Sequence, residues 1–301
     1  GQKEESIMTL LTIFTPSYNR SHTLSRVYKS LCHQTCMDFL WLIVDDGSTD
    51  GTAACVRRWK QSSPFQIQYL YQKNGGMHTA HNTAYAHIHT ELNMCLDSDD
   101  CLVPDAVDRI RHTWAQVRHK GYGGMIGLDA DLNTGKIIGR AFPPGLTATT
   151  LGGYYARGGA GDKKLIYRTD IMQSLPPYPV FDGEKYMGLA YKYILADQQY
   201  RLYVINQVLC NVEYQADGST RNMWLQYLKN PKGFACFRKL SMIYPRSPCR
   251  MVIDCIHYCS SSIIAGNPRF VEESPRKFLT LLCAPMGWLL TCMINRKVHV
   301  P

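Results

Sequence analysis

Acidic residues follow two apolar segments of this chain at the points where those segments end. Residues 40–44 ("LWLIV") lead directly into "DDGSTD" (residues 45–50), and residues 93–96 ("NMCL") lead into "DSDD" (residues 97–100). Neighbouring carboxylates can divide one task, because one can bind a ribose hydroxyl while the other holds a hard divalent cation that takes phosphate oxygens and waters as its remaining ligands. Such a cation makes a diphosphate a better leaving group. The structural alternative is that these Asp and Ser oxygens only cap turns and helix starts.

A third polar segment, "QKNGGMHTAHNTAY" (residues 72–85), combines a Gly-Gly pair with two histidines. Glycines directly before a helix allow a phosphate to approach the backbone N–H groups of the first turn. Gly75 and Gly76 are therefore candidate phosphate-binding residues, and His78 and His81 add polar side chains beside them. The alternative is an ordinary Gly-Gly turn.

The secondary structure that positions these groups can be predicted from the spacing of apolar residues. Short apolar segments alternate with segments whose apolar residues recur at helical spacing. Strands are expected at residues 10–15, 40–44, 67–71 and 93–96. The alternation predicts an α/β fold with a mostly parallel sheet and helices on both faces. Because ligands bind beyond the carboxyl ends of parallel strands, the polar clusters that follow three of these strands should converge at one edge.

The alternation ends near residue 140. Residues 141–162 are rich in Gly, Pro and Thr and are expected to form a long loop. A helix at residues 185–195 and a strand within residues 200–214 should follow, and the chain after Asp217 should be mainly helical.

The segment of residues 278–294 carries no charge, with Arg276 and Lys277 before it and Arg296 and Lys297 after it. Its 17 residues are at the lower limit for a membrane span, and a Pro and a Gly interrupt it. We expect a kinked or paired helix that lies on the membrane surface, so that residues 276–297 make peripheral membrane contact. The alternative is a buried C-terminal hairpin.

Composition narrows the class of protein. The formal net charge is +9, but Lys and Arg form no block longer than two residues, which argues against a nucleic-acid partner. The 12 cysteines include no CxxC pair, which favours reduced thiols in a cytoplasmic protein over a zinc site. The N-terminal residues show no signal peptide. A cytoplasmic location, on the inner face of the cell membrane if residues 276–297 make contact, is therefore expected.

Four motifs in this order resemble those of the inverting family 2 glycosyltransferases with a GT-A fold, of the kind that builds bacterial envelope polysaccharides. They are "TPSYNR" (15–20), "VDDGSTDGT" (44–52), "NGGMHTAHN" (74–82) and "LDSDD" (96–100). The resemblance implies a Rossmann-like GT-A catalytic domain and a mainly helical C-terminal extension. The expected boundaries are residues 1–225 for the catalytic domain, with a nucleotide-binding half at 8–130 and an acceptor half at 131–225, and residues 226–301 for the extension.

The resemblance also implies roles for residues on the donor side. Pro16 and Tyr18 would flank the base, Asp45 or Asp46 would contact uracil or ribose, and Asp97 would approach the ribose. Asp99 would bind Mg²⁺ or Mn²⁺. The other expected donor contacts are Asn19, Arg20, Gly75, Gly76, His78, His81, Ser98 and Arg221, the last either a phosphate ligand or a surface arginine. His81 and Ala84 stand where family members often carry Arg and Gly.

Inverting transfer needs a general base on the acceptor hydroxyl. In the family an acidic residue opens a helix after the central loop, and "PVFDGEKYMGLAYKYILAD" (residues 179–197) occupies that place. Glu184 is the favoured base and Asp182 the alternative, although Asp182 could also cap the helix. Asp197, at the far end, is expected to be a structural or solvated charge.

The resemblance implies a metal-dependent inverting transferase that moves a sugar from a UDP-sugar to a hydroxyl of a glycan or lipid-linked acceptor. The alternative is a catalytically inactive nucleotide-sugar-binding or scaffolding protein, which the His81 and Ala84 departures favour. A nucleotidyltransferase would need a Gly-rich loop after the first strand, and "TPSYNRSHT" (residues 15–23) contains no glycine.

Overall fold

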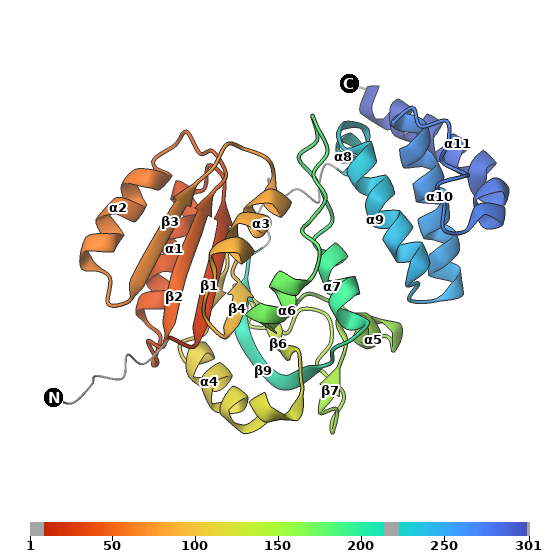
Figure 1. Ribbon diagram of the computed structural model, residues 1–301. Coiled ribbons are helices and arrows are strands. Elements are labelled where there is room, and N and C mark those ends of the chain that lie inside the picture. The colour runs from red at the N-terminus through yellow and green to blue at the C-terminus, as the bar shows by residue number, and fades with distance from the viewer. Residues whose placement is uncertain (1–8, 214–222, 300–301) are drawn as a thin grey trace.

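One nine-stranded sheet forms the centre of the molecule in the computed structural model, which describes residues 9–213 and 223–299 (Figure 1). Along the sheet the strands follow the order β3 (Gln66–Tyr71), β2 (Phe39–Asp45), β1 (Leu11–Ser17), β4 (Leu92–Cys95), β8 (Lys163–Arg168), β6 (Gly124–Asp131), β9 (Leu202–Val212) and β5 (Cys101–Leu102). A short strand, β7 (Ala148–Thr149), also pairs with β9.

Most strands run in the same direction. β3, β2, β1 and β4 are parallel neighbours. β8 is antiparallel to both β4 and β6, so β6 runs with β4, and β9 is parallel to β6. Only β5, β7 and β8 run the other way. The predicted mostly parallel sheet is confirmed, and β1 to β4 lie where the four N-terminal strands were expected.

Helices cover both faces of the sheet because its strands alternate apolar side chains between them. On one face, Ile13 packs in a core with α1 (Ser21–Cys32), α2 (Thr52–Ser62) and α4 (Ala106–Val117). On the other, Phe14 packs with α3 (Met77–His87), α6 (Thr169–Ser174) and α7 (Ala190–Asp197). A 3₁₀ turn, η1 (Arg118–Lys120), follows α4.

Two predictions for the central region need correction. The segment 141–162 is not only a loop, because it contains β7 and a short helix, α5 (Leu151–Ala156), whose N-cap Thr150 accepts a hydrogen bond from Gly153 N. The helix expected at residues 185–195 begins only at Ala190. Residues before it are held in a loop by the C-terminal helices, since Lys185 N donates to Asn230 Oδ1 and Gly188 packs against Phe237.

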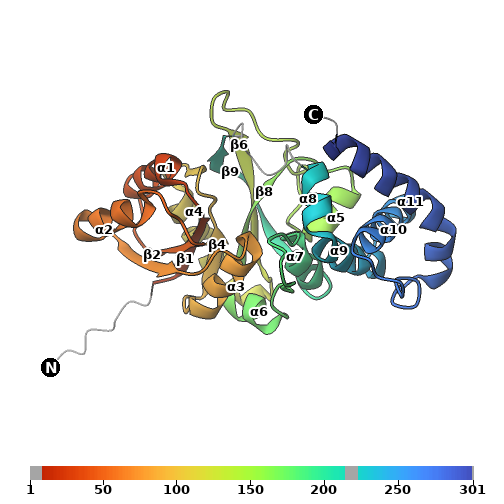
Figure 2. The same cartoon turned by 90° about the horizontal axis from the view of Figure 1, so that it is seen from above.

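The C-terminal region is helical, as predicted. It comprises α8 (Met223–Lys229), α9 (Pro231–Ile243), α10 (Pro248–Ile264) and α11 (Lys277–His299). These helices lie at the opposite end of the molecule from α2 and β3 (Figures 1 and 2). They have a small core of their own, built on Met242, Cys255, Tyr258 and Cys259. The boundary at residue 225 stays a prediction.

The apolar segment 278–294 forms no hairpin. It lies within α11, one continuous helix that includes Pro285. In the described part of the chain, α11 is the one helix long and apolar enough to cross a membrane, and only 28% of its apolar window is buried. The buried-hairpin alternative is therefore wrong, because one side of the helix packs on α10 and the other side is exposed.

Candidate functional site

The carboxyl ends of β1, β2, β4 and β6 meet at one edge of the sheet. Ser17 at the end of β1 pairs with Asp45 on β2, and Phe14 pairs with Cys95 on β4. Asp97 follows two residues after Cys95. Asp45 and Asp97 therefore flank the end of β1, two strand spacings or about 10 Å apart. The polar clusters that the sequence singles out do converge.

Asp45 and Asp46 are both bound by protein groups. Asp45 is buried and accepts hydrogen bonds from Ser48 N (2.7 Å) and from the Tyr69 hydroxyl (2.6 Å). Burial, and then the bond to Asp45, raise the pKa of Tyr69, so its proton stays in this bond. Asp45 thereby fixes the turn after β2. The predicted contact of either aspartate with the base stays a prediction.

The carboxylate of Asp46 shapes the Gly-Gly loop. Its Oδ1 accepts from Gln72 Nε2 (2.8 Å) and Gly75 N (2.9 Å), and its Oδ2 accepts from Gly76 N (2.8 Å) and Asn74 Nδ2 (3.3 Å). The two glycine N–H groups expected to face a phosphate therefore already donate to Asp46. Since each N–H offers one proton, a phosphate would have to displace Asp46 from these groups, and the predicted phosphate contacts of Gly75 and Gly76 stay a prediction.

Gly76 also brings two distant segments together. Its φ of +95° suits glycine, and a Cβ there would lie 2.0 Å from the carbonyl oxygen of Lys185. The loop before α3 is thus pressed against the segment that carries Asp182 and Glu184.

Two histidines of α3, His78 and His81, are buried inside the fold. Burial lowers the pKa of His81 to about 3, with the charges of His78 and Lys192 adding to the effect, and burial also lowers the pKa of His78. Both rings are therefore neutral at pH 7. The His81 ring packs edge-on against Phe14 and Tyr178, and its Nε2 lies 3.7 Å from Cys95 Sγ. Neither ring supplies the positive charge that a phosphate would attract.

The segment after β1 is bonded to the turn of residues 45–50. Asn19, with φ of +52°, donates from its N–H to Ser48 Oγ and accepts from Thr49 N. Pro16 lies in β1, and the Tyr18 side chain is half exposed at the strand end. Tyr18 is thus accessible to a ligand, whereas Asn19 joins its loop to the turn of residues 45–50.

Asp97 and Asp99 form a close acidic pair beside two guanidinium groups. Burial raises the pKa of Asp99 and the charge of Asp97 raises it further, whereas Arg20 and Arg26 oppose the rise. Ser98 between them is buried. Among the described residues, no three His, Cys, Asp or Glu side chains are grouped so as to hold a metal. A cation on Asp99 would therefore take its other ligands from a diphosphate and water, which is how Mg²⁺ is commonly held.

A cavity of about 270 Å³ opens next to Asp97, between the ends of β4, β6 and β8 and the start of α7. Sequence reasoning missed four of its charged residues: Asp129, Asp162, Lys163 and Lys164. Asp129 is buried on β6, Lys164 lies on β8, and Asp100, from the motif "LDSDD", lies 3.5 Å from the Lys164 ammonium. Burial raises the pKa of Asp100 to about 7 and that of Asp129 to about 6, with Lys164 opposing both shifts.

The predicted bases lie outside this cavity. Glu184 accepts hydrogen bonds from Lys232 N (2.9 Å) and Gly233 N (2.8 Å) in the first turn of α9. It therefore caps α9 and does not open α7 as expected. Asp182 is exposed in the same loop. Neither side chain is among those that line the cavity beside Asp97, and the role of either as base stays a prediction. Arg221 lies outside the described residues.

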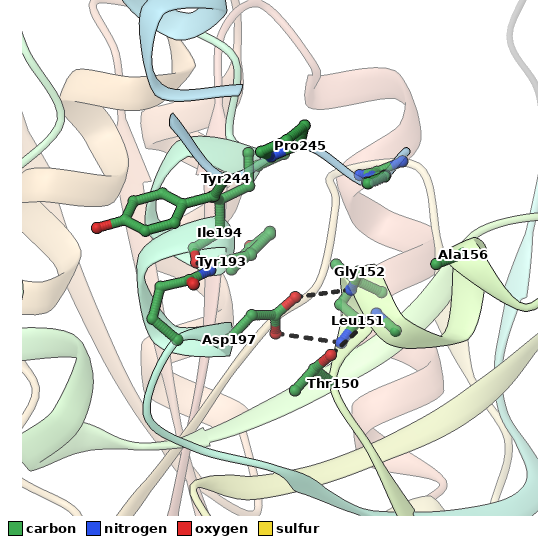
Figure 3. Close-up of a pocket in the computed structure, with 13 residues that line it drawn as sticks. Thr150, Leu151, Gly152, Ala156, Tyr193, Ile194, Asp197, Tyr244 and Pro245 are labelled. Carbon is green, nitrogen blue, oxygen red and sulfur yellow. Dashed lines mark hydrogen bonds between the residues drawn. The ribbon is translucent and has the colours of Figure 1, made fainter. Parts of the chain in front are cut away.

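A second cavity, of about 310 Å³, lies between α5, α7 and the connection from α9 to α10 (Figure 3). At its floor Asp197 accepts hydrogen bonds from Leu151 N (3.1 Å) and Gly152 N (2.6 Å). Burial raises the pKa of Asp197 to about 6. The structural role expected of Asp197 is confirmed by these bonds. Tyr193 lines both cavities.

Residues 12–134 match the family model described as "Glycosyl transferase family 2". Over 99 residues, a third of this chain, the sequence is 38% identical to the chondroitin synthase of Escherichia coli and 34% identical to the hyaluronan synthase of Pasteurella multocida. The matched parts are 14% and 10% of those proteins. Over 135 residues, 45% of this chain and 51% of the relative, it is 28% identical to the E. coli UDP-Glc:alpha-D-GlcNAc-diphosphoundecaprenol beta-1,3-glucosyltransferase WfgD.

Solved structures share the fold. TarS 1–349 of S. aureus, in complex with UDP-GlcNAc, aligns with a TM-score of 0.60 at 15% identity over 91% of this chain and 79% of TarS. The mannosyltransferase PcManGT of Pyrobaculum calidifontis, in complex with GDP-Man and Mn²⁺, aligns with a TM-score of 0.53 at 16% identity over 97% of this chain and 81% of the other. These likenesses establish the GT-A architecture, including the helical C-terminal region.

Proposed function

Because residues 12–134 match the model of glycosyltransferase family 2, we propose that the chain transfers a sugar from a UDP-sugar, with inversion, to a hydroxyl of a glycan or lipid-linked acceptor in bacterial cell-envelope polysaccharide synthesis. The observation that carries the proposal is the Asp97–Asp99 pair at the exit of β4, which adjoins a polar cavity and two guanidinium groups.

Asp99 would hold Mg²⁺ or Mn²⁺ together with diphosphate oxygens, and the cation would neutralise the departing UDP. Asp97 would orient the ribose, and Tyr18 would lie against the base. Arg20 and Arg26 act on Asp99 electrostatically, so their charges would add to the attraction for the diphosphate. Support for the nucleotide comes from TarS, whose structure holds UDP-GlcNAc, and support for the metal comes from PcManGT, whose structure holds Mn²⁺.

Glu184 is the proposed base for the acceptor hydroxyl, with Asp182 as the alternative. Because Glu184 caps α9, it would have to leave Lys232 N and Gly233 N before taking a proton. The contact between Gly76 and Lys185 places this loop beside the donor edge of the sheet.

An acceptor carried by a lipid would bring the enzyme to the cytoplasmic face of the membrane. WfgD, by its name, acts on a diphosphoundecaprenol-linked acceptor. Here α11 exposes Phe278, Leu281, Leu282, Trp288 and Leu289, and basic residues flank it. We include peripheral membrane contact through residues 276–297 in the proposal.

The substitution Asp99→Asn tests the donor side. We expect UDP to bind the native protein more tightly with Mn²⁺ than without it, and the variant to lose this metal-dependent gain, because an amide is a poor ligand for a hard cation. Calorimetric titration of UDP with and without Mn²⁺ measures the difference. Asp105→Asn, which alters a partly exposed aspartate paired with Arg109 at the start of α4, is the matched control. Unchanged manganese dependence in Asp99→Asn would remove Asp99 from the metal site.

A nucleotide-sugar-binding protein without catalysis is the second candidate. It is favoured by the position of both base candidates outside the cavity and by the neutral His81. Incubation with UDP-sugars, Mn²⁺ and a range of glycan acceptors separates the two. Transfer or donor hydrolysis supports the enzyme, whereas tight UDP binding with neither supports the binding protein.

A further inference from the structure

The cavity beside Asp97 contains charged groups that have no role in the proposed transfer as described above. Its volume of about 270 Å³ is at the small end for ligand cavities, with room for one sugar ring and not for a whole nucleotide-sugar. Asp97, which follows β4, and Leu189 and Tyr193, from the start of α7, are among the residues that line it. A donor whose diphosphate lies at Asp99 would reach this cavity with its sugar.

Three residues that line the cavity, Asp129, Tyr167 and His81, each have a buried polar atom without a hydrogen-bond partner. Asp129 is 2% exposed and its Oδ1 accepts no hydrogen bond, and the hydroxyl of Tyr167, 3% exposed, has no partner either. Buried polar atoms are nearly always paired, and each unpaired one costs free energy. Such atoms in the wall of one cavity, above all the unpaired oxygen of Asp129, indicate a ligand that brings its own hydroxyl groups.

We propose that this cavity receives the sugar ring of the donor, that Asp129 accepts a hydrogen bond from a ring hydroxyl, and that the transferred sugar is uncharged and not a uronic acid. This inference rests on the proposed function and adds the substrate class. It assigns Asp129 as a specificity-determining residue.

The charge of the cavity is the reason why we expect an uncharged sugar and not a uronic acid. The carboxylates in its wall outnumber the ammonium groups: Asp97, Asp100, Asp129 and Asp162 against Lys163 and Lys164. Lys163 Nζ points away, since it donates to four main-chain carbonyl oxygens of residues 138 and 160–162. Among the residues that the structure describes, Lys164 is then the cation of this wall, and Asp100 lies 3.5 Å from it. A uronate carboxylate would thus add a further negative charge to a poorly hydrated, already anionic site, which disfavours its binding.

Titration calorimetry with Mn²⁺ tests the inference on the full chain. The ligands are UDP, four neutral sugar nucleotides (UDP-glucose, UDP-galactose and their N-acetylamino forms), UDP-glucuronate and UDP-galacturonate. We expect at least one neutral sugar nucleotide to bind about tenfold or more tightly than either uronate. Asp129→Asn should weaken that ligand about tenfold, the effect of losing one hydrogen bond to a charged acceptor, and leave the affinity for UDP unchanged.

Asp131→Asn is the matched control, because Asp131 lies on the same strand but bonds only to its own turn at Asn133 N and Thr134 N. It should change no affinity. A uronate that binds more tightly than every neutral sugar overturns the inference, as does an Asp129→Asn variant that binds the neutral sugar nucleotides as well as the native protein does. Binding of UDP in either case would leave the proposed function standing. If neither UDP nor any UDP-sugar binds, the proposed function fails and the inference fails with it.

Discussion

Single carboxylates in this protein do two different kinds of work. Asp46 receives four donors, which fill the acceptor positions of its two oxygens. In this structure Asp46 shapes the loop of residues 74–76. Asp129, by contrast, is buried with an unpaired oxygen. A saturated carboxylate contributes to the fold, whereas an unsaturated one is held ready for a ligand.

Asp129→Asn should therefore stabilise the protein in the absence of ligand. Burial raises the pKa of Asp129 to about 6, so the folded protein holds this proton more tightly than the unfolded chain does. The free energy of unfolding therefore falls as the pH rises from about 4 through about 6, and at pH 8 the ionised group costs up to about 3 kcal/mol. We expect urea unfolding of the variant to show a gain of that order at pH 8 and a much smaller gain at pH 4.5. An equal effect at both pH values would contradict the assigned cause.

The close contact between the loop before α3 and the segment that precedes α7 depends on one glycine, Gly76. Gly76→Ala should destabilise the fold by about 3 kcal/mol or more, because its Cβ would lie 2.0 Å from the Lys185 carbonyl oxygen in addition to the unfavourable φ of +95°. Gly121→Ala is the matched control, since Gly121 has φ of +76° and nothing within 4 Å of the added Cβ. It should cost only about 1 kcal/mol. Equal losses in the free energy of unfolding for the two variants, measured by urea unfolding, would show that the close contact with Lys185 does not add to the destabilisation.

The helix α9 depends on a side chain from another element. Glu184→Gln should destabilise the protein by about 1 kcal/mol, because the carboxylate that receives Lys232 N and Gly233 N loses its charge at the positive end of the helix. As the proposed base, the same variant should retain UDP binding and stop sugar transfer. Asp182→Asn, at an exposed position of the same loop, is the control. Near-normal turnover in Glu184→Gln, with transfer lost in Asp182→Asn, would move the base to Asp182.

These elements also show how far local sequence can predict the site. The strands that end at Ser17, Asp45 and Cys95 were predictable because each combines an apolar run with a polar exit. The late start of α7 was not, since it depends on the contacts of residues 184–188 with α9. Asp129 and Lys164 were missed because the antiparallel pairing of β6 with β8 brings them together. The two residues are 35 positions apart, and nothing in the local sequence of either strand predicts this pairing.

At the scale of the whole molecule, two features of α11 decide how it would meet a membrane. One side of the helix is locked to α10: Thr291 Oγ1 lies 2.9 Å from Ser260 Oγ, and a Cβ on Gly287 would lie 2.4 Å from Cys259 Cβ. α11 therefore cannot cross a bilayer without α10, which carries the buried ion pair of Asp254 with Arg238. An orientation parallel to the surface follows.

The exposed side of α11 suits that orientation. Its large apolar side chains recur at helical spacing along one side: Phe278, Leu281, Leu282, Met286, Leu289 and Met293. No acidic residue occurs after Glu273, while Arg276, Lys277, Arg296 and Lys297 flank the apolar stretch. An anionic lipid surface would meet apolar residues between two basic ends, which are the two components of interfacial binding.

We therefore expect the full chain to float with vesicles that contain phosphatidylglycerol and to bind weakly to vesicles of phosphatidylcholine alone. The double variant Leu282→Ser with Leu289→Ser should lose most of this binding, because each buried leucine contributes roughly 1.5–3 kcal/mol to an apolar contact. Its melting temperature should equal that of the native protein, since both side chains face solvent. Val180→Ser, which removes an exposed apolar side chain far from α11 in sequence, is the control. Self-association that disappears in the double variant, without any vesicle binding by the native protein, would instead show that a second copy covers this side of the helix.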